Sequence, residues 1–225
     1  MVAPLSAISV YVRGSSVTTL VRLAAVVTAE DLRLVAQVCC RALQPYAEAD
    51  WEGPAGELEW SCRETLAHML SALAFYAVNL VRRSIEPRSG GQTNDTLPIE
   101  VLLDAFEGRA VVLAALVDAA PGDARGAHEY GRSDPAGFAA MGCDEMLVHT
   151  ADIAAGLGAA FDPPRDLCER VLARLFPWAP ADHDAWATLL WANGRAPLGD
   201  RARLEPDWVW LSVPLEEWNG EDPNR

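Results

Sequence analysis

The chain has 225 residues, 51% of them hydrophobic, and a formal net charge of −14 at pH 7. That is enough material for one sizeable domain, or for a domain with a small appendage. The acidic balance argues against nucleic acid or an anionic membrane as a partner, because both attract basic surfaces.

All 18 basic residues are arginine. The absence of lysine excludes Schiff-base chemistry, a lysine general base and the lysine of a phosphate-binding P-loop.

The first predicted element in chain order is an N-terminal extension, residues 1–27. It is mildly apolar but is interrupted by Arg13 and Arg22, and it lacks the continuous apolar run and the cleavage site of a signal peptide. No stretch of the sequence approaches the roughly 18 uncharged apolar residues that a membrane span needs. We therefore expect a poorly ordered extension and no membrane partner.

Two helices are predicted next. Thr28 followed by Asp31 resembles a helix N-cap, and apolar residues then recur at helical spacing, which predicts a helix over about 29–46. Ser61 and Glu64 form the S-x-x-E pattern of a capping box, which opens a long second helix that reaches about residue 83. The polar stretch after it predicts a loop.

Two further helices complete a bundle. Residues 98–120 favour a third helix, and Asp134-Pro135 supplies a cap residue and a proline for the start of a fourth, which runs to about Gly156 or Gly158. Four helices joined by polar loops predict a mainly α protein, an antiparallel four-helix bundle over residues 28–162.

The character of the sequence changes after residue 162. Two short helices are predicted near 165–175 and 182–193, and residues 207–218 alternate like a strand or an extended segment. Residues from 163 onward hold six of the eight tryptophans. We expect a small α/β C-terminal subdomain, residues 163–225, packed on the bundle.

The five cysteines have no C-x-x-C or other regular spacing, which argues against a disulfide framework and against a cysteine zinc site. We expect a reducing, cytoplasmic location. Cys143 is predicted to be a buried small apolar residue, and His128 and His183 are expected at the surface.

One face of the fourth helix carries residues that suggest chemistry. Glu145, His149 and Asp152 are spaced i, i+4 and i+7, so they lie on one side of the helix. His68 lies in the middle of the second helix among small side chains. A divalent cation between the two helices would offset the cost of burying these groups. The alternative is a solvated Glu145–His149 pair and a hydrogen-bonded core histidine.

These segments resemble a known family. "DWEGPAGELEWSCRETLAHML" and "DEMLVHTADIAAGLG" resemble the helix motifs of the DinB-like, mycothiol-dependent maleylpyruvate isomerase family. "LLWANGRAPLGDR" and "PDWVWLSVPLEEWNG" resemble C-terminal segments of an actinobacterial branch of that family. Together the similar segments lie within residues 28–220.

The resemblance implies a DinB-like bundle that holds zinc, or another divalent metal, through His68, Glu145 and His149. Two imidazoles and a carboxylate leave an open position on zinc, which in such an enzyme takes the sulfur of mycothiol. Asp152 is expected to accept the ring N–H of His149, with a solvated or capping side chain as the alternative. The resemblance places Arg195 near the metal, where it can bind a substrate carboxylate; the alternative is a surface charge.

The leading hypothesis is a zinc- and mycothiol-dependent enzyme that adds the thiolate to a small electrophilic substrate, either as an S-transferase or as a cis–trans isomerase. Two alternatives remain: a metal-dependent hydrolase with water in the open position, and a non-catalytic helical metal- or ligand-binding protein. The sequence leaves open whether the protein is a monomer or a homodimer.

Overall fold

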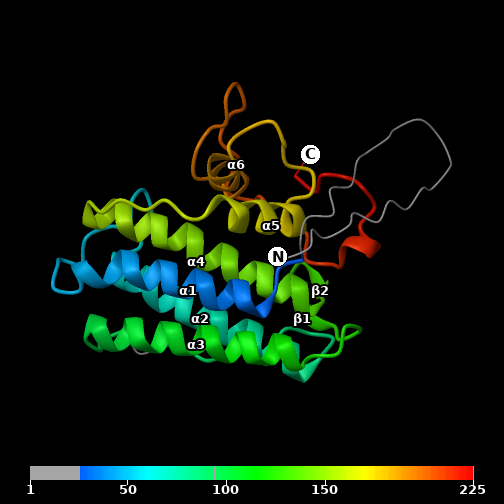
Figure 1. The fold of residues 1–225 in the computed structure, drawn as a ribbon, viewed down its shortest axis with the longest axis horizontal. Helices are drawn as coiled ribbons and strands as arrows, with labels where there is room; N and C mark the ends of the chain where they lie inside the picture. The colour runs from blue at the N-terminus through cyan, green and yellow to red at the C-terminus, as the bar shows by residue number, and fades with distance from the viewer. Residues whose placement is uncertain (1–25, 94, 225) are drawn as a thin grey trace, which may run out of the picture.

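The computed structural model describes residues 26–93 and 95–224 (Figure 1). The predicted N-terminal extension therefore lies outside the described residues, except for Val26 and Val27. In chain order the elements are α1 (Ala29–Leu43), η1 (Gln44–Tyr46), α2 (Cys62–Arg82), α3 (Ile99–Ala119), β1 (Gly126–His128), β2 (Gly131–Ser133), α4 (Pro135–Leu157), α5 (Arg165–Leu175), α6 (Ala185–Ala192) and η2 (Leu215–Glu217).

Helix starts follow local capping signals. At α1 the Thr28 side chain accepts from the backbone N–H of Asp31, whose carboxylate accepts from the backbone of Thr28 in return. Ser61 and Glu64 make the same reciprocal pair at α2. Asp134 caps α4 through the backbone N–H of Gly137 at 2.9 Å. These caps satisfy N–H groups that have no partner within the helix, so the starts agree with the sequence.

The predicted four-helix bundle is confirmed. α1 and α2 each pack against both α3 and α4, and the shared core is made of leucine, alanine, methionine and phenylalanine side chains. Figure 1 shows these four long helices lying along one another, with the C-terminal part of the chain covering the α4 side.

The helix α3 runs parallel to α2, whereas the sequence predicted a fully antiparallel bundle. The connection after α2 runs back along that helix, because Arg63 at the start of α2 donates to the carbonyls of Asp95 and Leu97. Asn79 near the end of α2 holds the other part of the connection, through Arg88. The connecting loop of about 16 residues can span roughly 50 Å, which exceeds the length of α2. These contacts therefore place the start of α3 beside the start of α2, and the two helices run parallel.

The small α/β part is also present, but its strands lie elsewhere than expected. β1 and β2 form an antiparallel hairpin between α3 and α4. The segment 207–218, predicted as a strand or extended stretch, contains no strand: it begins in a turn at Asp207, and η2 lies within its last residues. α5 packs on α4, and α6 packs on α5.

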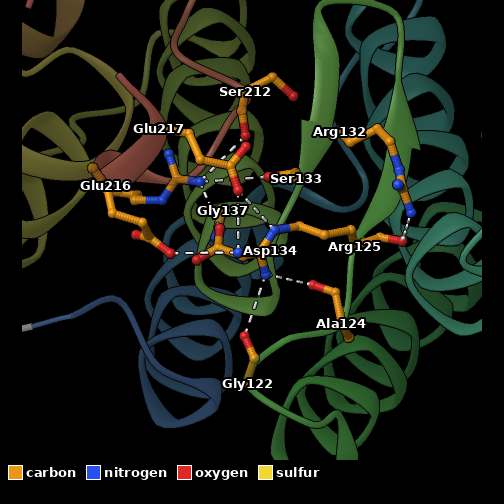
Figure 2. Close-up of polar contacts among 11 residues, drawn as sticks. Gly122, Ala124, Arg125, Arg132, Ser133, Asp134, Gly137, Ser212, Glu216 and Glu217 are labelled. Carbon is orange, nitrogen blue, oxygen red and sulfur yellow. Dashed lines mark hydrogen bonds and ion pairs between the residues drawn. The ribbon is translucent and has the colours of Figure 1, made fainter. Parts of the chain in front are cut away.

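Contacts of two arginines, of which only Arg174 is buried, attach the C-terminal segment to the bundle (Figure 2). Arg174 of α5 is 5% exposed and donates to the carbonyls of Leu211 and Ser212. Its Nη2 also lies 2.6 Å from the Asp134 carboxylate. Arg125, just before β1, forms ion pairs with both glutamates of η2. The segment that follows α6 is therefore held against the start of α4.

The expectation that no stretch approaches a membrane span is wrong by length and composition alone, because the described helix α2 passes both criteria. Half of its apolar window is buried inside the protein. The core helix of a bundle passes the same test, so this property carries little weight for a membrane role.

Candidate metal centre

His68 of α2 faces Glu145 and His149 of α4; the His68 side chain is partly exposed, and the other two are largely buried. The Nε2 atoms of His68 and His149 each lie 3.3 Å from the same carboxylate oxygen, Oε2 of Glu145. One potential ligand atom from each residue lies within 4.8 Å of the other two. The structure thus brings together all three predicted metal ligands, which come from helices far apart in the sequence.

The donor set fits a divalent cation. Tyr76 donates its hydroxyl hydrogen to Oε1 of Glu145 at 3.0 Å, whereas Oε2 is buried and has no hydrogen-bond partner among the described residues. A buried carboxylate oxygen without a partner is costly, and a cation bound between it and the two imidazoles would satisfy it. Two histidines and one glutamate form a ligand set of catalytic zinc sites.

Burial and the neighbouring charged groups act in opposite directions on the pKa values of Glu145 and His149. Burial acts to raise the pKa of Glu145, but the imidazoles of His149 and His68 lower it well below its usual range. Burial acts to lower the pKa of His149, but the hydrogen bond to Asp152 and the nearby carboxylate of Glu145 raise it to about 9. Without a cation, the site therefore holds an ionised carboxylate and attracts a proton to His149.

Asp152 and Arg195 extend the site behind His149. The Nδ1 of His149 lies 3.0 Å from Oδ2 of Asp152, so the carboxylate accepts the Nδ1 proton and leaves Nε2 directed at Glu145. Arg195 donates to Asp152 through Nε and through Nη2, the latter at 2.9 Å. The expected Asp152–His149 contact is thus present. The binding of a substrate by Arg195 stays a prediction, since its guanidinium pairs with Asp152.

The sequence reasoning missed two aromatic neighbours of the ligands. Tyr76 follows His68 by eight residues, which puts both on one face of α2, and this spacing was the available signal. Trp60 lies just before the cap of α2, and its ring centroid is 4.9 Å from that of His68. Trp60 is 44% exposed, so it covers the solvent side of the centre.

A pocket of about 310 Å³ opens beside the centre, between α4, the β1–β2 turn and the C-terminal segment. It is lined by Glu129, Tyr130, Asp144, Glu145, Val148, His149, Asn193, Arg195, Pro206, Trp208 and Trp210.

Two contacts shape the pocket walls. Asn193 donates to the buried carboxyl group of Asp144 at 3.0 Å, and burial raises the pKa of Asp144 to about 7. Gly194 has a φ of 65°, and a Cβ there would lie 3.0 Å from two atoms of the Trp208 indole. Only glycine combines this left-handed backbone with so close an approach.

None of the five cysteines lines this pocket. Burial raises the pKa of Cys39, Cys40 and Cys168 to about 12, and raises those of Cys62 and Cys143 as well. The prediction that Cys143 is buried is confirmed. A thiolate at this centre would have to come from a separate molecule.

The prediction of a surface position for His128 is wrong. Its side chain is 7% exposed and contacts the rings of Phe75, Tyr76 and Trp210, because the β1–β2 hairpin folds against the end of α2. Burial lowers the pKa of His128. His183 is exposed, as predicted.

Comparison with known families places residues 32–154 in the mycothiol maleylpyruvate isomerase N-terminal domain. The match spans more than half of the chain and includes all three candidate ligands, whereas Arg195 lies outside it. No curated protein and no solved structure matches the chain. The match confirms the family predicted from the helix motifs, and the family points to mycothiol-associated isomerase or transferase activity in general.

Proposed function

We propose that this chain, which belongs to the mycothiol maleylpyruvate isomerase N-terminal domain family, is a zinc-dependent enzyme that adds the thiolate of mycothiol to a small electrophilic substrate. The observation that carries the proposal is Oε2 of Glu145, which is buried without a hydrogen-bond partner between the Nε2 atoms of His68 and His149.

The chemistry requires a thiolate near neutral pH. Zinc, or another divalent cation held by His68, Glu145 and His149, would lower the pKa of a bound thiol enough to supply it. The protein's own cysteines are poorly suited to the role, because burial raises the pKa of each one.

The surrounding residues have positioning roles in this proposal. Tyr76 fixes one oxygen of Glu145, so that the other faces the imidazoles. Asp152 accepts the Nδ1 proton of His149 and thereby keeps Nε2 free to act as a ligand. Arg195 holds the Asp152 carboxylate in place. The adjacent pocket has room for a small electrophile next to the centre.

The reaction has two possible outcomes. The sulfur forms a C–S bond with the electrophilic carbon, and the displaced electron pair moves onto the electron-withdrawing group of the substrate. If that carbanion takes a proton from solvent, the product is a thioether, and the enzyme is an S-transferase. If the C–S bond breaks again after bond rotation, the thiolate leaves and the net reaction is cis–trans isomerisation.

The test is elemental analysis of the purified full-length protein, followed by titration with mycothiol before and after chelation. We expect about one zinc per chain and thiol binding that disappears with the metal. Metal without thiol affinity would overturn the proposal and favour hydrolysis. Absence of metal would favour a non-catalytic binding protein.

A further inference from the structure

We infer that the pocket beside the centre selects electrophiles that carry an aromatic or planar apolar group and no carboxylate. The inference rests on the proposed function and names the substrate class of the same site. It follows from three features of the pocket: the partners of its single arginine, the charges of its other side chains, and its aromatic wall.

Arg195 has few free donors for a substrate acid. Its Nε and Nη2 both donate to Asp152, and its Nη1 donates to the carbonyl of Asn193 at 3.0 Å. A bidentate clamp needs two parallel N–H groups from one guanidinium edge, and the Nε–Nη2 edge is already taken by Asp152. Substrate binding there would break a part-buried ion pair that also steadies His149.

Apart from the metal, the pocket wall offers no free cation to a substrate acid. The charge of a bound divalent cation would itself be offset by the Glu145 carboxylate and the thiolate. Apart from Arg195 and His149, the ionisable side chains that line the pocket are carboxyl groups, Glu129, Asp144 and Glu145, together with the phenol of Tyr130. Asp152 neutralises Arg195, so Arg195 contributes no net positive charge to the wall. The net charge of −14 adds a field that repels anions as they approach.

The wall formed by the β1–β2 turn and the C-terminal segment is aromatic. The ring centroids of Trp208 and Trp210 are 5.7 Å apart, and Tyr130 meets Trp210 edge to face at 6.0 Å. Such a wall favours planar or cationic groups, through stacking and through attraction of a cation to the ring faces. The pocket thus combines an aromatic side with an acidic side.

The experiment compares three matched electrophiles: trans-β-nitrostyrene and its para-carboxylate and para-trimethylammonium derivatives. Each is reacted with mycothiol by the zinc-loaded full-length protein, and kcat/KM is divided by the uncatalysed rate for that compound. We expect the carboxylate to be disfavoured by at least about tenfold against the neutral parent, with a gap that narrows as salt is added. Intrinsic tryptophan fluorescence, quenched by the same compounds without thiol, measures binding independently of turnover.

A charge-reversal variant locates the discrimination. Glu129→Arg should reduce the penalty on the carboxylate severalfold, because it places a cation on the pocket wall. Glu48→Arg makes the same charge change at an exposed residue that lies outside the pocket. Glu48→Arg should leave most of the preference for the neutral compound over the carboxylate unchanged.

The outcomes separate this inference from the proposed function. A carboxylate that reacts as efficiently as the neutral parent, or more efficiently, would overturn the inference and leave thiol transfer standing. If none of the three compounds is accelerated, the metal and mycothiol titration still decides the proposed function, and the fluorescence quenching decides this inference. In that case tighter quenching by the neutral and cationic compounds than by the carboxylate would still support the pocket assignment, and equal or reversed quenching would overturn it.

Discussion

His68 and His149 come from different helices, yet their imidazole rings meet edge to face, with centroids 5.0 Å apart and planes at 79°. In this arrangement both Nε2 atoms lie 3.3 Å from one oxygen of Glu145. A divalent cation between these atoms would satisfy the carboxylate oxygen and both ring nitrogens at once. The relationship is therefore the basis for the predictions about metal.

Removal of either histidine should abolish tight metal binding. We expect His68→Ala and His149→Ala to weaken zinc binding by at least about a hundredfold, because two ligands rarely hold zinc against competing chelators. Competition with a chromophoric chelator measures the affinity. His183→Ala, at an exposed histidine, is the matched control. Full zinc occupancy in both ligand variants would rule out this site.

The carboxylate behind His149 should tune the metal affinity without being a ligand. Asp152→Asn should weaken zinc binding by about 10–100-fold, because the amide orients the imidazole less firmly and makes it less basic. Arg195→Gln should have a smaller effect in the same assay, since Arg195 acts through Asp152. A larger loss in Arg195→Gln than in Asp152→Asn would contradict this order.

The buried arginine of α5 should stabilise the C-terminal segment. Arg174→Met leaves the Asp134 carboxylate without its ion-pair partner and two backbone carbonyls without the arginine donor. The free energy of unfolding should fall by about 3 kcal/mol, measured by urea denaturation with circular dichroism.

Arg165→Met is the control for that measurement, because its ion pair with Glu169 is exposed. It should change the free energy of unfolding by less than about 1 kcal/mol. Equal losses in the two variants would show that the buried contacts of Arg174 do not stabilise the fold.

The capping box of α2 should make part of the stability depend on pH. Hydrogen bonds from the backbone and side chain of Ser61 lower the pKa of Glu64. A carboxylate with a lowered folded-state pKa stabilises the fold above its unfolded pKa, and this stabilisation is lost as the pH falls through the folded value. The deficit of Glu64→Ala relative to wild type should therefore be present at neutral pH and shrink under acid.

Urea denaturation at a series of pH values tests the capping prediction. Glu205→Ala, at an exposed carboxylate outside any helix, is the control and should show little pH-dependent change. A Glu64→Ala deficit that stays constant into the acid range would mean that the charge of Glu64 contributes nothing to the cap.

Much of the local structure was predictable from sequence. The capping patterns at Thr28, Ser61 and Asp134 act within three residues, so they place the helix starts without knowledge of the fold. The ligand pair Glu145 and His149 was likewise visible, because i, i+4 spacing puts both on one helix face.

Contacts between distant segments were decided only by the tertiary structure. The parallel run of α2 and α3 depends on Arg63 holding a loop more than thirty residues away. The burial of His128 depends on a hairpin folding against α2. The pairing of Arg195 with Asp152 joins residues 43 positions apart.

The sequence by itself therefore determined the helices and the pair Glu145 and His149, because short-range spacing encodes them. The family, and with it His68 as the third ligand, followed from the resemblance of longer segments to known helix motifs. The tertiary structure decided the unpartnered oxygen of Glu145, the engagement of Arg195 and the aromatic wall of the pocket. These depend on which side chains meet across the core, and packing between elements sets that geometry, whereas local propensity does not.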